Sequence, residues 1–140
     1  MIIGLQHSHS GLAYLFVFST GISMLLSWMT FMVGPKPVFL KVGAVLARVV
    51  ETSIGGLMAI LGILLCFMLN VPLSTAYIWI GLAVVIASGG MIARGIKPSI
   101  LGLAAQDDRA LRLQWVMFAT AHFGLVALAM VSMLYRWGQA

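Results

Sequence analysis

Residues 43–69, GAVLARVVETSIGGLMAILGILLCFML, decide the fold, because this long apolar run holds only two charged side chains, Arg48 and Glu51. The hydrocarbon core of a bilayer is about 30 Å thick and is crossed by about 20 mostly apolar residues in an α-helix. The run stops at residues 70–72 (NVP), a sequence typical of a turn. We therefore predict that residues 43–69 span a membrane.

Three further apolar stretches of similar length flank this one: residues 11–33, 75–92 and 113–135. The first stops at a Gly-Pro-Lys-Pro sequence, whose two prolines cannot continue a helix. Of the 140 residues, 62% are hydrophobic and 8% are charged, whereas about a quarter of a soluble domain is charged. The sequence therefore predicts an all-α integral membrane protein. Its four transmembrane helices form a single domain over residues 1–140, with the lipid bilayer as the main solvent.

The basic residues are unevenly divided between the two sides of these spans. Seven of the eight flank the first and third connections: Lys36, Lys41, Arg48, Arg94, Lys97, Arg109 and Arg112. Only Arg136 lies on the other side. Basic flanking residues mark the cytoplasmic side, so we predict an antiparallel four-helix bundle with both termini outside the cytoplasm, in a bacterial inner membrane. The net charge of +5 then reflects orientation and contact with anionic lipid, and it does not indicate nucleic-acid binding.

The third connection, about residues 95–112, is the longest and mixes apolar with charged side chains. It predicts either a short interfacial helix begun by Pro98 or an extended end of the third span. Asp108 is a suitable N-cap for the fourth helix, because a carboxylate can accept a hydrogen bond from a free backbone N–H group.

Small residues recur at helical spacing on two of the predicted spans. They form one face on each helix: Ser19, Ser23 and Ser27 on the first, and Gly55, Ala59 and Gly62 on the second. Small side chains let helices approach closely in lipid, where packing drives association. The two faces predict helix-packing surfaces, either within the bundle or between copies of the chain.

Glu51 lies about two turns inside the second span, where ionisable side chains are rare and face protein or water. Arg48 is one turn earlier, at a spacing that allows an ion pair. His122, in the fourth span, lies at a similar depth of roughly 12 Å from the cytoplasmic side. We therefore predict an intramembrane polar cluster of Arg48, Glu51 and His122. The alternatives are a proton or cation site at Glu51 and a haem b site with His122 as axial ligand.

His7 and His9 form an H-x-H sequence at the outer end of the first span. Residues two apart face different sides of a helix, so this pair could hold one copper ion only in an irregular or extended segment. The ten methionines show no clustering that would add soft ligands, and lipid-facing packing explains them. His9 and His122 lie too far apart in depth to hold one haem together.

No catalytic signature or phosphate-binding loop is present in the sequence. We therefore expect a non-enzymatic membrane protein that acts by association, as a homo-oligomer or as an accessory subunit of a larger membrane complex. The first alternative is a haem b- or copper-binding protein in electron transfer or metal handling. The second alternative is a small proton or ion carrier that uses Glu51.

Three short motifs resemble a known family: residues 5–9 (LQHSH), 48–52 (RVVET) and 93–95 (ARG). Together with the four-span length, they are similar to the small SirB-like membrane proteins and, more distantly, to the CopD-like four-helix domains. This resemblance implies a four-helix membrane fold, and CopD-like domains are linked to copper uptake. Arg48 stands where the SirB-like motif has a histidine, so the resemblance carries no metal or haem role to this position.

Overall fold

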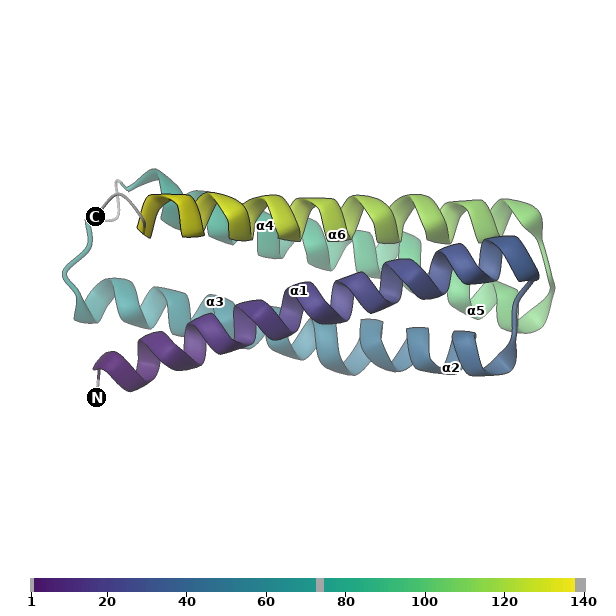
Figure 1. Ribbon diagram of the computed structural model, residues 1–140, viewed down its shortest axis with the longest axis horizontal. Helices are drawn as coiled ribbons and strands as arrows, with labels where there is room; N and C mark the ends of the chain where they lie inside the picture. Colours follow the sequence, from purple (N-terminus) through teal and green to yellow (C-terminus); the bar gives the residue numbers. More distant parts are fainter. Residues whose placement is uncertain (1, 73–74, 138–140) are drawn as a thin grey trace.

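The computed structural model describes residues 2–72 and 75–137, and within these ranges the chain is helical apart from short turns (Figure 1). Two of the elements, η1 and η2, are π-helical turns inserted into longer α-helices. In chain order the elements are α1 (Ile2–Val33), α2 (Pro37–Val45), η1 (Leu46–Glu51), α3 (Thr52–Met68), α4 (Ala76–Met91), η2 (Ile92–Ile96), α5 (Lys97–Ala105) and α6 (Arg109–Trp137).

These elements join into four long helices, because α2, η1 and α3 are continuous, as are α4, η2 and α5. All four are long and apolar enough to cross a membrane: Ile3–Val33, Pro37–Met68, Ile78–Ala105 and Arg109–Ser132. The predicted all-helical architecture with four candidate spans is therefore confirmed for the described residues.

The helices are longer than the apolar runs that predict them. The first begins at Ile2 rather than at residue 11, and the second begins at Pro37 rather than at residue 43. Polar residues do not stop a helix, and proline is favoured in its first turn. The 32 residues of the second helix measure about 48 Å, more than the thickness of a bilayer core of about 30 Å. The second helix is therefore longer than a bilayer core is thick.

The third helix continues through Pro98 to Ala105, so α5 is an extended end of this helix and the separate interfacial helix is wrong. The π-helical turn η2 precedes the proline, and the Lys97 backbone N–H donates to the Ile92 carbonyl there. The Ser99 hydroxyl also donates to the Gly95 carbonyl at 2.7 Å. The remaining connection is short, and the Asp108 carboxylate accepts the Ala110 N–H at 2.8 Å, which confirms the predicted N-cap.

Figure 1 shows the turns at residues 34–36 and 106–108 at one end of the bundle, which we call the basic end. We call the opposite end, where α1 begins and α3 finishes, the far end. Helix α1 packs against α3 and α6, and α4 packs against the same two helices. Toward the basic end the core is tightly packed. A Cβ atom on Gly95 would collide with the Phe118 ring, and one on Gly43 would lie 2.7 Å from the Trp115 ring.

Candidate functional site

Two ionisable side chains meet inside the bundle, Glu51 at the end of η1 and His122 in the middle of α6. The His122 Nδ1 atom lies 3.6 Å from the Glu51 Oε2 atom, and both side chains are buried to 1% exposure or less. Equal depth along their helices made this contact feasible from the sequence. The way α6 packs on the neighbouring helices then turns the two side chains toward each other.

The polar atoms of this pair have no hydrogen-bond partner among the described residues. This applies to both carboxylate oxygens of Glu51 and to both ring nitrogens of His122. The Ser23 hydroxyl of α1 lies beside the Glu51 carboxyl group, but no well-aligned hydrogen bond joins them. Most buried polar groups in folded proteins are paired. Two adjacent ionisable side chains without a partner among the described residues are an exception to that rule, and they make this pair the candidate site.

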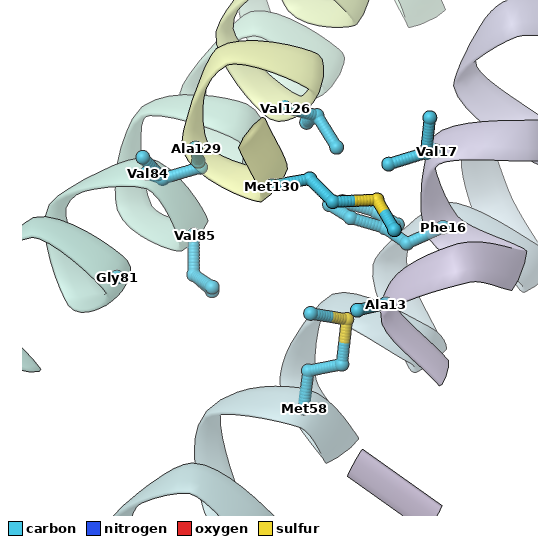
Figure 2. A pocket seen from close by; sticks show the side chains of 10 residues that line it. All are labelled: Ala13, Phe16, Val17, Met58, Gly81, Val84, Val85, Val126, Ala129 and Met130. Carbon is cyan, nitrogen blue, oxygen red and sulfur yellow. The ribbon is translucent and has the colours of Figure 1, made fainter. Parts of the chain in front are cut away.

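On the side toward the far end, the pair is enclosed by apolar groups. The Phe16 ring meets the His122 ring edge-on, with centroids 5.8 Å apart, and the Phe16 ring also packs over Gly55. Beyond Phe16 lies a cavity of about 50 Å³ that is surrounded by apolar side chains of α1, α3, α4 and α6 (Figure 2). Apolar cavities of this kind stay dry. The walls of this cavity therefore offer water no hydrogen-bond partner, and the nearest buried polar atom toward the N-terminus of α1 is Nδ1 of His9.

On the side toward the basic end, buried hydroxyl groups continue along one face of α1. Ser23 is followed by Ser27 and Thr30, and all three are almost completely buried. Ser27 donates to the Met24 carbonyl at 2.6 Å and Thr30 to the Leu26 carbonyl at 2.8 Å. Each donating hydroxyl oxygen keeps lone pairs that can accept a further hydrogen bond.

The hydroxyl face ends at the charged residues of the basic end. Arg112 donates to the Phe31 carbonyl at 3.4 Å and pairs with Asp107 at 3.0 Å. The Glu51 and His122 pair therefore has polar groups on one side and apolar groups on the other.

The predicted ion pair between Arg48 and Glu51 is wrong. Arg48 is exposed on the outside of the bundle, and no ion pair between these two residues occurs in the described part of the chain. The prediction assumed α-helical spacing, whereas residues 46–51 form a π-helical turn. A π-helix bonds residue i to residue i+5, so each turn holds more residues. Arg48 is thereby rotated off the face that carries Glu51, and the cluster of three reduces to Glu51 and His122.

His7 and His9 do not come together as a metal site. Both belong to α1, which is α-helical from Ile2, so the two imidazoles diverge. His7 is exposed, whereas His9 packs on α3, with its Cε1 atom 3.3 Å from the Cβ position of Gly62. Nowhere in residues 2–72 and 75–137 do three or more histidine, cysteine or acidic side chains form a group that could hold a metal.

Haem ligation by His122 does not fit the surroundings of this residue. Cofactor pockets usually measure about 300–1,000 Å³, but the cavity next to the Phe16 ring holds only about 50 Å³. The His122 side chain is enclosed by Phe16 and Glu51 instead. The packing leaves no room for a porphyrin ring beside this imidazole.

The small-residue faces lie within the bundle. Ser19, Ser23 and Ser27 are buried on α1, while Gly55 and Gly62 of α3 contact side chains of α1. Ala59, between these two glycines, is half-buried. The serine face is therefore buried inside the bundle, and the two glycines of α3 contact α1 through the Phe16 and His9 side chains.

Two close contacts escaped the sequence analysis: those of the Trp115 and Phe118 rings of α6 with Gly43 and Gly95. The sequence signal that could have indicated them is a glycine at the same depth in the bundle as an aromatic residue on another helix. This signal has meaning only once the helix neighbours are known.

No protein-family model, curated protein or solved structure matches this chain. The SirB-like resemblance consequently stays a prediction, and the case for the site rests on its geometry.

Proposed function

We propose that this chain is an integral membrane protein in which the Glu51 and His122 pair takes up and releases a proton, as in a small proton or ion carrier. The observation that carries this proposal is the contact of two fully buried ionisable side chains, with His122 Nδ1 3.6 Å from Glu51 Oε2 and no well-aligned hydrogen bond to either group among the described residues. An ionisable residue inside a membrane protein is expensive to keep and usually marks a functional site.

The charge balance of the pair supports proton exchange. A protonated carboxyl group beside a neutral imidazole carries no net charge, and a carboxylate beside an imidazolium also sums to zero. Gain or loss of one proton leaves one uncompensated charge in a site of low dielectric constant, which is costly. The protein can lower that cost by a change of packing around the pair. Proton binding and conformation are therefore coupled at this position.

The direction of exchange follows from the two sides of the site. The buried hydroxyl groups lead from Ser23 toward the basic end, whereas the Phe16 ring and the apolar walls of the cavity lie on the side toward the far end. We infer that the four helices form an antiparallel bundle with the basic end in the cytoplasm and both termini outside, in a bacterial inner membrane. The basic residues of that end support this orientation. The side chain of Arg136 lies outside the described part of the chain.

Proton flux into liposomes tests this proposal. Vesicles that contain the purified chain are expected to dissipate an imposed pH gradient faster than empty vesicles. Glu51→Gln keeps the shape of the side chain but replaces the titratable carboxyl group with an amide that does not ionise, so flux should fall to the empty-vesicle rate. Asp107→Asn is the matched control, because it removes an exposed carboxylate at the basic end. Wild-type flux equal to that of empty vesicles, or undiminished flux in a folded Glu51→Gln variant, would contradict the proposal.

Association with a second copy of the chain is the second candidate. The third helix carries its specific observation, since only 17% of its most apolar window is buried, against 33% in the first and fourth helices. Its exposed side bears the small residues Ala83, Gly90 and Ala93 on one helix face, with the larger Ile86 between the first two. Small residues on one face favour close helix contacts in lipid. A homo-oligomer, or an accessory role in a larger complex, would use this side.

Oligomeric mass in mild detergent tests the second candidate. Gly90→Leu should convert a dimer to a monomer, because the larger side chain separates the facing helices. Gly124→Leu is the control, since a Cβ atom at Gly124 on α6, as at Gly90, meets nothing within 4 Å. A monomeric wild-type protein, or equal effects of the two substitutions, would exclude a dimer through this side.

A further inference from the structure

A groove runs between the neighbouring helices α2 and α5 at the basic end of the bundle. It is distinct from the site of the Glu51 and His122 pair. The two helices are neighbours, and the groove between them has a volume of about 430 Å³. Its walls are apolar side chains of both helices, among them Leu40, Ala44, Ile100 and Leu103. Lys41 is the one charged residue in its lining. The groove thus combines an apolar trough with a single cation.

The charge around this groove is positive. Lys36 is exposed and lies between two prolines of the lining, Pro35 and Pro37. The two acidic residues of the basic end are already engaged, because Asp107 pairs with Arg112 and Asp108 caps α6. Neither acidic residue belongs to the lining. An anionic ligand would therefore meet Lys41 without a carboxylate in opposition. Lys36, whose ammonium group lies 5.9 Å from the centroid of the Phe39 ring, adds positive charge beside the lining.

The position of the groove along the bundle matches the headgroup region of a bilayer. All of α2 lies within nine residues, or about 13 Å, of the turn that begins it. Arg48 and Arg94 are exposed next to the inner ends of α2 and α5. Long basic side chains at such a level extend toward the membrane interface. The groove therefore opens where acyl chains meet phosphate groups.

We propose that this groove binds one anionic phospholipid. The acyl chain lies against the apolar walls, and the phosphate group pairs with Lys41, with Lys36 as the second cation. Basic pockets between transmembrane helices on the cytoplasmic side are known to take anionic headgroups. A free phosphate would use Lys41 but would leave the apolar trough without a role, and a zwitterionic lipid would gain little from the two lysines.

Native mass spectrometry of the full-length protein tests the lipid site. The probes are phosphatidylglycerol and phosphatidylcholine with identical acyl chains, and inorganic phosphate alone. Wild-type protein should retain one phosphatidylglycerol in preference to phosphatidylcholine and should retain no phosphate. Lys41→Gln should weaken phosphatidylglycerol binding about fivefold, the effect of one basic charge near an anionic headgroup. Arg109→Gln is the matched control, because it removes an exposed charge of the same end that lies outside the groove lining.

A second variant tests the apolar half of the site. Ala104→Trp places a bulky ring at the groove wall and should reduce retention of phosphatidylglycerol even with Lys41 intact. The proposal is overturned if both lipids are retained equally by the wild type, if Lys41→Gln and Arg109→Gln act alike, or if Ala104→Trp leaves binding unchanged. Retention of phosphate at the level of the lipid would also overturn it. None of these outcomes depends on proton flux through Glu51.

Discussion

The two halves of the bundle, on either side of the Glu51 and His122 pair, are built differently. The half toward the basic end contains both π-helical turns, the buried hydroxyls and the lysine-lined groove. The half toward the far end has regular α-helices, a small cavity with apolar walls and fewer polar groups, among them His9 and Ser132. The irregular backbone and the buried hydroxyls of α1 therefore occur in the same half, whereas the regular half is mainly apolar and is the less favourable route for water or a proton. A protein that needs access to an internal site from one side only would be built in this way.

The largest expected effect comes from leaving one member of the pair without the other. His122→Leu leaves the Glu51 carboxyl group buried alone, and the loss of stability is expected to be about 3 kcal/mol. Glu51→Leu should cost less, because a neutral imidazole is easier to bury than a carboxyl group. The double variant should recover much of the loss, since two apolar side chains of similar size can replace a buried polar pair. Thermal unfolding in detergent measures all three variants.

Arg48 is the control for this experiment. Because its side chain is exposed, Arg48→Leu should change stability by less than about 0.5 kcal/mol. A large effect of Arg48→Leu, combined with a small effect of His122→Leu, would indicate that Glu51 pairs with Arg48 and not with His122.

The difference between predicted and observed pairing shows where sequence reasoning stops. Four spans follow from hydropathy alone, because lipid tolerates few charges and helices satisfy their own backbone. The depth of Glu51 and His122 also follows, since helix rise is constant. The pairing of Glu51 with Arg48 on the same helix could not be judged from the sequence. A π-helical turn changes the angle between successive side chains, and it has no clear sequence signature. The groove beside Lys41 needs the neighbour relation of α2 and α5, which hydropathy does not contain.

The next effect concerns close packing in the basic half. Gly95→Ala places a methyl group on the Phe118 ring and should lower stability by about 2 kcal/mol, as in other overpacked cores. Gly89→Ala on the same helix is the matched control, because a Cβ atom there meets nothing within 4 Å. This control should be neutral or slightly stabilising, since alanine is the better helix former. Equal unfolding temperatures of the two variants would show that α6 packs less closely on η2.

A smaller effect is expected when the half toward the far end is made more polar. Val126 is buried beside the cavity, and Val126→Thr adds a hydroxyl group there at a cost of about 1 kcal/mol. A polar group gives water a partner in the cavity, so proton flux through Glu51 should rise. Val131→Thr is the control, because that side chain is exposed. If both variants leave flux unchanged, the apolar half is not the barrier.

The smallest effect on stability is expected in the hydroxyl face of α1. Ser27→Ala removes one intrahelical hydrogen bond, and bonds between polar groups in membrane proteins contribute about 0.6 kcal/mol on average. Stability should therefore hardly change. Proton flux, in contrast, should fall, because Ser27 is the polar group between Ser23 and Thr30 on the side that leads to the basic end.

Ser132→Ala separates these two readouts. Ser132 donates to the Ala129 carbonyl at 2.7 Å, which is the same kind of intrahelical bond as that of Ser27, but it lies near the far end of α6. Both alanine variants should lose the same small amount of stability, whereas only Ser27→Ala should slow proton flux. Equal flux in the two variants would mean that the hydroxyls serve helix packing alone. The proton would then reach Glu51 by another route, and the contrast between the two halves would be one of packing rather than of access.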